Sequence, residues 1–206
     1  MSGKGAGLAG LPGSHLANLT PSQLASGLAG QLPEELGGQE FLDAHGPHLD
    51  AVTTVDPARR YAVRTAACHP IHEHARVRAF QQLLRVPQSN EQLSLLGELM
   101  MQSHESYSAC GLGSGGTDRM VALVREHMAA AARAGRPPAL WGAKITGGGC
   151  GGTVCILGSA SEEAEAAVAQ LVADYCAATG QQGVHVFRGS SVGAVAFGHV
   201  VVRLSL

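Results

Sequence analysis

The chain has 206 residues, 45% of them hydrophobic, and a formal net charge of −2 at pH 7, which is enough apolar material for one globular domain. Its lysines and arginines are scattered, so the composition argues against a nucleic-acid-binding surface. No apolar run approaches the roughly 18 residues that a membrane-spanning helix needs, and the N-terminus lacks the apolar core of a secretion signal.

The cysteines and histidines offer no recognisable metal site. The five cysteines form no CxxC pair, which is the usage of a reduced intracellular protein, and we therefore expect a cytoplasmic location. His69, His72 and His74 crowd into HPIHEH, but this spacing matches neither an HExxH helix nor a zinc finger. We predict no metal ligands here and interpret the cluster as part of a helix start.

The N-terminal third of the chain is weakly patterned. Residues 1–15 are Gly-rich and nearly featureless, so we predict a disordered tail followed by one domain over residues 16–206. Residues 33–41 suggest a short helix with a turn. A longer helix is predicted to have Pro70 in its first turn and to run to residue 84. The apolar side of this helix comprises Val77, Phe80, Leu83 and Leu84.

Two more helices follow. Ser89 with Gln92 three residues later has the pattern of a capping box, and apolar residues at helical intervals extend a helix over about residues 90–108. A third helix is predicted to start after Thr117, with Asp118 in its first turn, where the helix dipole favours an anion. The predicted buried face of that helix comprises Met120, Val121, Val124 and Met128.

The hydrophobic period then changes to that of strands. Ser159 with Glu162 is expected to cap a fourth helix over about residues 162–178. The four predicted strands cover residues 140–146, 153–158, 184–189 and 194–204. Helices followed by strand–strand–helix–strand–strand indicate an α+β fold, in which an antiparallel sheet packs against helices.

The loop between the first two predicted strands is unusually rich in glycine. It comprises Thr146, Gly147, Gly148, Gly149, Cys150, Gly151 and Gly152. Glycine costs ordering entropy, so such a run is expected where the backbone takes positive φ or approaches a partner closely. Free N–H groups in such a loop form an anion nest, and we predict that the loop lies beside a phosphate. The alternative is a plain flexible connection in a hairpin.

A second glycine-rich stretch, residues 111–116, precedes the third helix. N–H groups at a helix start attract anions, but Asp118 would repel a phosphate there. A neutral polyol such as a sugar fits better, and Gly113, Ser114 and Asp118 are the candidate substrate-side residues. Alternatively, Thr117 and Asp118 simply cap the helix.

Both stretches match GxGxxG, yet neither stands in the context of a known nucleotide fold. The dinucleotide-binding fold needs a strand, the glycine loop and then a helix. Residues 111–116 follow a predicted helix instead, and residues 147–152 precede a strand. No Lys-Ser/Thr pair follows either stretch, so the phosphate-binding P-loop is also excluded.

Four segments carry a family signature. The stretch AKITGGGCGGTVCILG (residues 143–158) resembles the third conserved motif of the GHMP kinases. Residues 61–80 and 103–121 are similar to the Arg-His…Glu segment and to the Ser-His-x-Ser helix of the galactokinase and L-arabinokinase branch. Residues 190–198 resemble a C-terminal strand region of the same branch. The resemblance covers roughly residues 33–205.

The resemblance implies a two-domain kinase that transfers a phosphoryl group from ATP, with Mg²⁺, to the anomeric hydroxyl of L-arabinose or galactose. It implies a C-terminal domain with a ferredoxin-like core, whose third motif lies near the transferred phosphate. The N-terminal half of these kinases carries a PxxxGLSSSA phosphate loop and a catalytic aspartate, and neither appears in this sequence. We therefore expect the C-terminal part of a sugar-1-kinase that has no catalytic residue of its own and is incomplete alone. Its expected partners are ATP, a monosaccharide and a separate N-terminal half, without nucleic acid or membrane.

The sequence also departs from the family pattern. Cys68 stands where the relatives have an arginine before His69, and a thiol cannot imitate the arginine fork. Other departures are Gly115 for Asp, Cys150 for Ser or Phe, Val192 for Pro and Ala196 for Lys. These changes leave the identity of the sugar open. They also support an alternative function, a non-catalytic relic or subunit that binds a sugar or a nucleotide.

Overall fold

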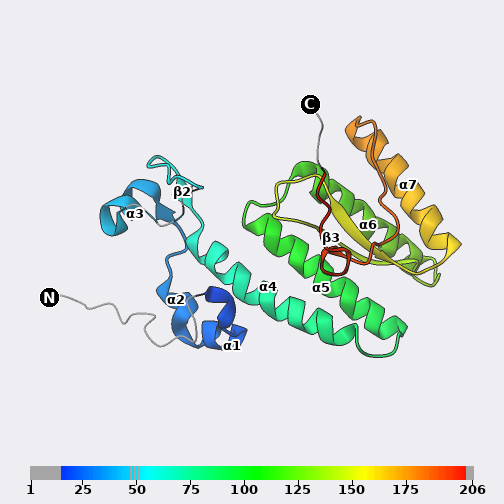
Figure 1. Ribbon diagram of the computed structural model, residues 1–206, viewed down its shortest axis with the longest axis horizontal. Helices are drawn as coiled ribbons and strands as arrows, with labels where there is room; N and C mark the ends of the chain where they lie inside the picture. Colours follow the sequence, from blue (N-terminus) through cyan, green and yellow to red (C-terminus); the bar gives the residue numbers. More distant parts are fainter. Residues whose placement is uncertain (1–14, 47, 49, 51, 203–206) are drawn as a thin grey trace.

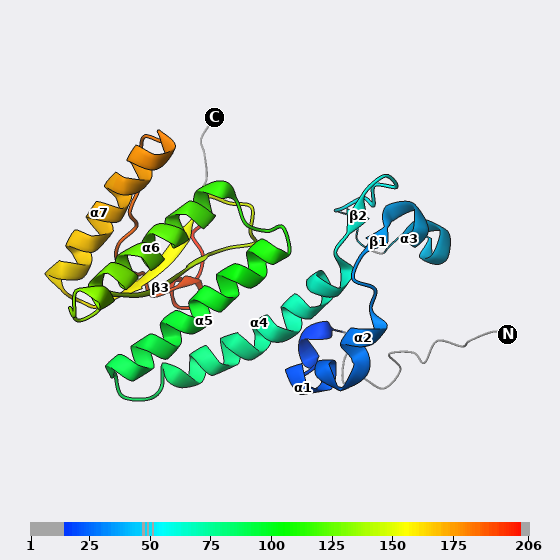
Figure 2. The same cartoon turned by 180° about the vertical axis from the view of Figure 1, so that it is seen from behind.

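A computed structural model describes residues 15–46, 48, 50 and 52–202, so the predicted tail lies outside the described residues except for His15. Two long helices, α4 (Val63–Leu83) and α5 (Asn90–Ala109), form an antiparallel hairpin. Helices α6 (Gly115–Arg133) and α7 (Glu162–Thr179) and the strands between them lie on one side of this hairpin (Figure 1). The small N-terminal elements gather at the beginning of α4, as the reverse view also shows (Figure 2).

The N-terminal elements are short. They are η1 (Leu16–Asn18), α1 (Pro21–Gln23), η2 (Leu24–Leu28), α2 (Ala29–Gln31), β1 (Leu36–Gly37), α3 (Gly38–His45) and β2 (Arg60–Tyr61). The strands β1 and β2 pair antiparallel. The short helix with a turn predicted over residues 33–41 is confirmed only in part, because α3 begins at Gly38, after irregular backbone and the strand β1, and continues to His45.

Helix α4 begins at Val63, so the prediction that Pro70 occupies its first turn is wrong. Proline inside a helix removes one hydrogen bond and presses on the preceding turn. The next residue, Ile71, is almost completely buried and packs against Leu19 and Leu24, and this contact favours the continuous helix. The predicted apolar side is also wrong in part, because Val77 and Leu84 are 55% and 61% exposed.

Helix α5 starts as predicted, but its capping box is only half formed. The Ser89 hydroxyl accepts a hydrogen bond from the backbone N–H of Gln92. The Gln92 side chain does not return to the cap, because its amide donates to the Leu83 carbonyl at 2.7 Å. Gln92 therefore links the start of α5 to the end of α4.

Helix α6 starts earlier than predicted. Its N-cap is Ser114, which exchanges hydrogen bonds with Thr117 in a capping box. Thr117 therefore lies inside the first turn, and Asp118 is in that turn as predicted. Val121 and Val124 are buried as predicted.

The sheet of this half of the chain has two strands, β3 (Leu140–Ile145) and β4 (Val154–Gly158), which pair antiparallel as predicted. Helix α7 follows, but its N-cap is Ser161 and not Ser159. The Ser159 hydroxyl instead accepts from the indole N–H of Trp141 at 3.0 Å. Gly180, in the left-handed conformation, ends α7.

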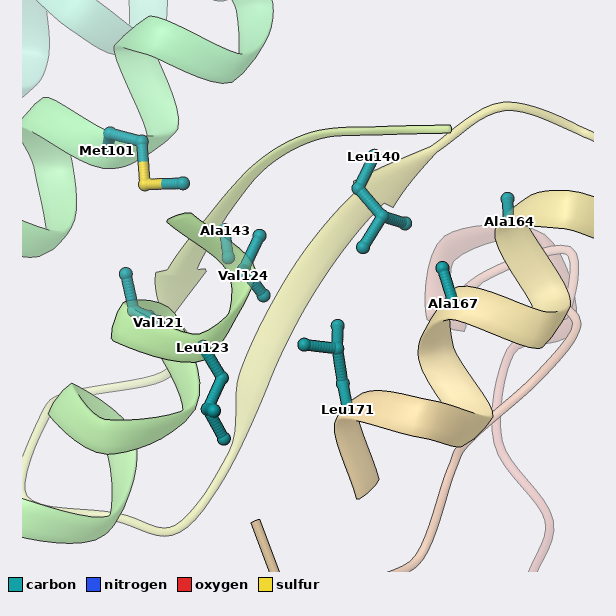
Figure 3. Close-up of a cluster of buried hydrophobic side chains, with 9 residues drawn as sticks. All are labelled: Met101, Val121, Leu123, Val124, Leu140, Ala143, Ala164, Ala167 and Leu171. Atoms are coloured by element: carbon teal, nitrogen blue, oxygen red, sulfur yellow. The ribbon is translucent and has the colours of Figure 1, made fainter. Parts of the chain in front are cut away.

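The main hydrophobic core lies where β3 meets the surrounding helices (Figure 3). Helix α6 contributes buried side chains from one side and α7 from the other, and Leu140 and Ala143 of β3 join them. The buried residues of this core are Met101, Val121, Leu123, Val124, Leu140, Ala143, Ala164, Ala167 and Leu171. The core therefore joins α5, α6, α7 and β3, which are the elements that position both glycine-rich loops.

The strands predicted at residues 184–189 and 194–204 do not form in the described part of the chain, where Ala194–Phe197 is instead the short helix α8. Most apolar side chains of this region are exposed, for example those of Phe187 and Val200. Strand propensity is realised only when a strand finds a partner and a surface to pack on. The α+β class with an antiparallel sheet packed against helices is confirmed, but within the described residues this sheet lacks the further strands of a ferredoxin-like core. No described helix is long and apolar enough to cross a membrane.

Candidate phosphate and sugar site

The structure brings the two glycine-rich stretches into contact. We call residues 111–116 the first glycine loop and residues 147–152 the second glycine loop. The backbone N–H of Cys150 donates to the Leu112 carbonyl at 2.6 Å, and the Cys150 thiol lies 3.7 Å from the Gly111 carbonyl oxygen. The two loops, far apart in sequence, therefore form one surface at the start of α6.

The second glycine loop has a defined shape. Gly147, Gly149 and Cys150 all have positive φ values, of 81°, 88° and 53°, a region that residues with a side chain rarely adopt. A Cβ atom on Gly149 would lie 2.6 Å from the Cβ of Leu112 and 2.9 Å from its carbonyl oxygen. Glycine is required at this position both for its conformation and for the close approach of the two loops.

Most backbone N–H groups of the second glycine loop have no partner within the described chain. The N–H of Thr146 donates to the Thr153 carbonyl and closes the hairpin, and the N–H of Cys150 is used by Leu112. None of the hydrogen bonds in the described residues uses the N–H of the five glycines of this loop. The loop therefore offers several free donors for an anion, but Cys150, counted with the loop in the sequence analysis, is not one of them.

The sugar-side candidates surround the carboxylate of Asp118. Its Oδ1 accepts a hydrogen bond from the Ser108 hydroxyl at 2.9 Å and lies 3.2 Å from Nε2 of His104. Gly113 packs closely here, because a Cβ atom on it would lie 3.0 Å from the same oxygen. The hydroxyl of Ser114 lies 3.5 Å from the Gly151 carbonyl oxygen. All three candidates, Gly113, Ser114 and Asp118, therefore lie at the junction of the loops.

Sequence reasoning missed a second polar cluster, which lies between α4, α5 and β3. Glu73 accepts hydrogen bonds from Ser103 at 2.6 Å and from Arg76 at 2.8 Å, and the Lys144 ammonium lies 3.5 Å away. Burial by itself would raise the pKa of Glu73, but these hydrogen bonds and the two positive charges outweigh it and lower the pKa. The i, i+3 spacing of Ser103 and Ser106, which places two hydroxyl groups on the same face of α5, was the signal in the sequence that could have indicated this cluster.

His69 belongs to the same cluster. Its Nδ1 lies 2.7 Å from the Ser106 hydroxyl, and its ring meets Tyr107 edge to face. Burial lowers the pKa of His69, the negative charge of Glu73 opposes this, and the nearby positive charges add to it. Cys68, in the position of the family arginine, packs instead against the small buried cluster that contains Ile71.

A pocket of about 790 Å³ opens beside the loops. It lies between β4, α7 and residues 181–188. Its walls combine aliphatic and polar side chains, and Thr117 and Thr146 connect it to the glycine-rich surface. Among the described residues, no group of three or more His, Cys, Asp or Glu is arranged to hold a metal ion.

Comparisons with known proteins show what this part of the chain is similar to. Residues 79–178, which contain both glycine loops, match the family model for the C-terminal domain of GHMP kinases. The chain is also 46% identical over 168 residues to the L-arabinokinase of Arabidopsis thaliana. That match covers 81% of this chain and 16% of the plant protein, so the chain spans only a small part of its relative. Residues 79–178 of this chain are therefore a C-terminal domain of the GHMP kinase family.

Proposed function

We propose that this chain supplies the C-terminal part of an ATP-dependent sugar-1-kinase, which phosphorylates the anomeric hydroxyl of L-arabinose or galactose. One observation carries the proposal beyond the family. The second glycine loop, with its free backbone donors, is held against the first glycine loop, where Asp118 lies half-exposed. A group that can bind phosphate and a group that can bind a polyol are therefore neighbours.

The phosphate side of the proposed site consists of backbone. Phosphoryl transfer depends mostly on positioning and on stabilisation of the charge that develops on the phosphate oxygens. ATP would supply the phosphoryl group, and the free N–H groups of the second glycine loop would hold phosphate oxygens. We assign no described residue to the Mg²⁺ that such kinases use.

The sugar side consists of Asp118 with its neighbours Gly113 and Ser114. A carboxylate with an open oxygen accepts hydrogen bonds from sugar hydroxyls. We assign it a binding role, since no residue of this chain is proposed as the catalytic base. The five cysteines are free, in line with the cytoplasmic location that we propose.

We expect no measurable sugar-kinase activity from the 206-residue chain by itself. Lowering the barrier enough for turnover needs several positioned groups acting together, and the matched plant enzyme is much longer than this chain. We therefore propose a further partner, an N-terminal kinase half that binds most of the ATP.

A chimera tests the proposal. The matching segment of the Arabidopsis L-arabinokinase is replaced by residues of this chain, and formation of sugar 1-phosphate from ATP is measured with L-arabinose and galactose. Turnover of either sugar supports the proposal. A folded chimera that binds a sugar or ATP without turnover favours the alternative, a non-catalytic binding relic or subunit.

Two glycines of the second glycine loop provide a matched pair of variants in the chimera. Gly149→Ala should reduce turnover on the order of a hundredfold, because the new methyl group separates the two loops. Gly151→Ala should have little effect, because its Cβ would meet only the Gly149 carbonyl oxygen at an ordinary 3.8 Å. Cys150→Ser should also be nearly neutral, since its main contact uses the backbone. Undiminished turnover of both alanine variants would refute this placement of the phosphate site.

A further inference from the structure

His104 is a buried histidine that connects the two sides of the candidate site. It comes from α5, and its side chain is only 7% exposed. Its Nδ1 accepts a hydrogen bond from the backbone N–H of Ile145 at 3.3 Å, next to the beginning of the second glycine loop. Its Nε2 lies 3.2 Å from Oδ1 of Asp118 in the first turn of α6.

These two contacts specify the protonation state of the ring. The N–H of Thr146 donates to the Thr153 carbonyl of the neighbouring chain segment. Successive N–H groups of a strand point to opposite sides, so the N–H of Ile145 points away from β4 and toward His104, which accepts its hydrogen bond. A ring nitrogen that accepts a hydrogen bond carries no proton, so the proton of His104 is on Nε2 and is donated to Asp118.

The surroundings also favour the neutral ring. Burial lowers the pKa of His104. The charged groups that act on it are Asp118 and Glu105, which raise the pKa, and Arg125 and Lys144, which lower it. The balance is a pKa below the usual value for histidine.

The carboxylate of Asp118 is held on one side only. Its Oδ1 receives the hydrogen bonds from both His104 and Ser108, and no hydrogen bond among the described residues reaches Oδ2. The side chain is 48% exposed. One oxygen is therefore fixed by the protein, while the other remains available to a hydroxyl group from outside.

We infer that neutral His104 is a positioning residue, which orients Asp118 with Oδ2 toward the sugar and ties it through Ile145 to the second glycine loop. This inference rests on the proposed function, because it requires a sugar at Asp118. A protein group can orient a substrate effectively only when that group is itself held in place.

The first test needs no activity. The ¹⁵N resonances of the His104 ring are recorded in the 206-residue chain near pH 7. We expect a proton on Nε2 and none on Nδ1, and slow hydrogen exchange at the Ile145 amide. A proton on Nδ1, or a cationic ring at this pH, would overturn the inference.

The second test separates the two hydrogen bonds by substitution. In His104→Asn the side-chain oxygen takes the place of Nδ1, so the bond to Ile145 is kept and the donor to Asp118 is lost. In His104→Gln the amide nitrogen takes the place of Nε2, so the donor to Asp118 is kept. Glu98→Gln, an exposed change on the same helix, is the control.

Calorimetry with L-arabinose and galactose then measures the effect on the 206-residue chain. We expect binding to weaken about three- to tenfold in His104→Asn, the loss of one oriented hydrogen bond, and to recover largely in His104→Gln. Unchanged binding in His104→Asn would overturn the positioning role alone. If the wild-type chain binds neither sugar, the sugar site of the proposed function fails, and the inference fails with it whatever tautomer is found.

Discussion

Gly97 of α5 and Gly142 of β3 meet backbone to backbone, and Gly97→Ala should therefore be strongly destabilising. A Cβ atom on Gly97 would lie 1.8 Å from the carbonyl oxygen of Trp141 and 2.5 Å from its carbonyl carbon. The opposite glycine is also too close for a side chain, because a Cβ on Gly142 would lie 2.5 Å from the Gly97 Cα. Each obstacle is backbone, which cannot rotate away as a flexible side chain can.

The magnitude follows from the displacement that the methyl group demands. Ordinary contact begins at 3.4 Å, so α5 must retreat by about 1.6 Å from the Trp141 carbonyl. The same helix places Leu96 and Met100 in the core with 2% and 6% exposure. Overpacking costs about 1–3 kcal/mol or more, and alanine recovers about 0.5–1 kcal/mol of helix propensity. We expect a net loss of about 2 kcal/mol in the free energy of unfolding.

Urea unfolding of the 206-residue chain measures this change. The control is Gly115→Ala in the first turn of α6, where a Cβ would meet nothing within 4 Å and the change should be neutral or stabilising by up to about 1 kcal/mol. In Gly97→Ala the retreat of α5 should also speed hydrogen exchange at the Ile145 amide, whose acceptor His104 is on the same helix. A Gly97→Ala variant as stable as the wild type, with an unchanged m-value, would refute the close contact.

Three further predictions concern the electrostatics and the caps. The free energy of unfolding should fall as the pH drops below about 6.5. Burial lowers the pKa of His69 and His104 in the folded chain, so the unfolded chain then takes up more protons, and the loss of stability ends below the folded pKa values. Urea titrations that show constant stability between pH 7.5 and 5 would contradict this prediction. Glu73→Gln should lower the free energy of unfolding by about 2–3 kcal/mol, because it leaves two nearby positive charges without their counter-charge. The control Glu105→Gln, in an exposed pair, should lower it by less than about 1 kcal/mol. Similar losses in the two variants would show that burial of the Glu73 pair does not matter. Ser161→Ala should cost about 1 kcal/mol through loss of the α7 cap, and thermal unfolding that shows no change would rule out this cap.

The sequence alone predicted those features that depend on neighbouring residues. The cap at Ser89 and the hairpin around the second glycine loop both appear as expected. Each depends on contacts within a few residues, such as a side chain bonding to the next turn or an alternation of side chains along a strand. The α+β class follows from the order of these elements, and the family resemblance was confirmed by comparison.

The tertiary structure decided the features that depend on distant partners. The predicted strand at residues 184–189 remains unpaired because its alternating pattern does not by itself supply a neighbouring strand. Helix α4 continues through Pro70 because Ile71 packs against the N-terminal helices. In the first case the local signal finds no distant partner, and in the second a distant contact outweighs it.

The candidate site combines both kinds of information. Its residue types could be read from the sequence, since a run of glycines and an acidic residue in the first turn of a helix are visible there, while their roles stay predictions. Its geometry could not, because Cys150 meets Leu112 and His104 meets Ile145 only after α5 and α6 pack on β3. A contact across some 40 residues leaves no periodic trace along the chain, since it is the close packing of the core that selects the partners.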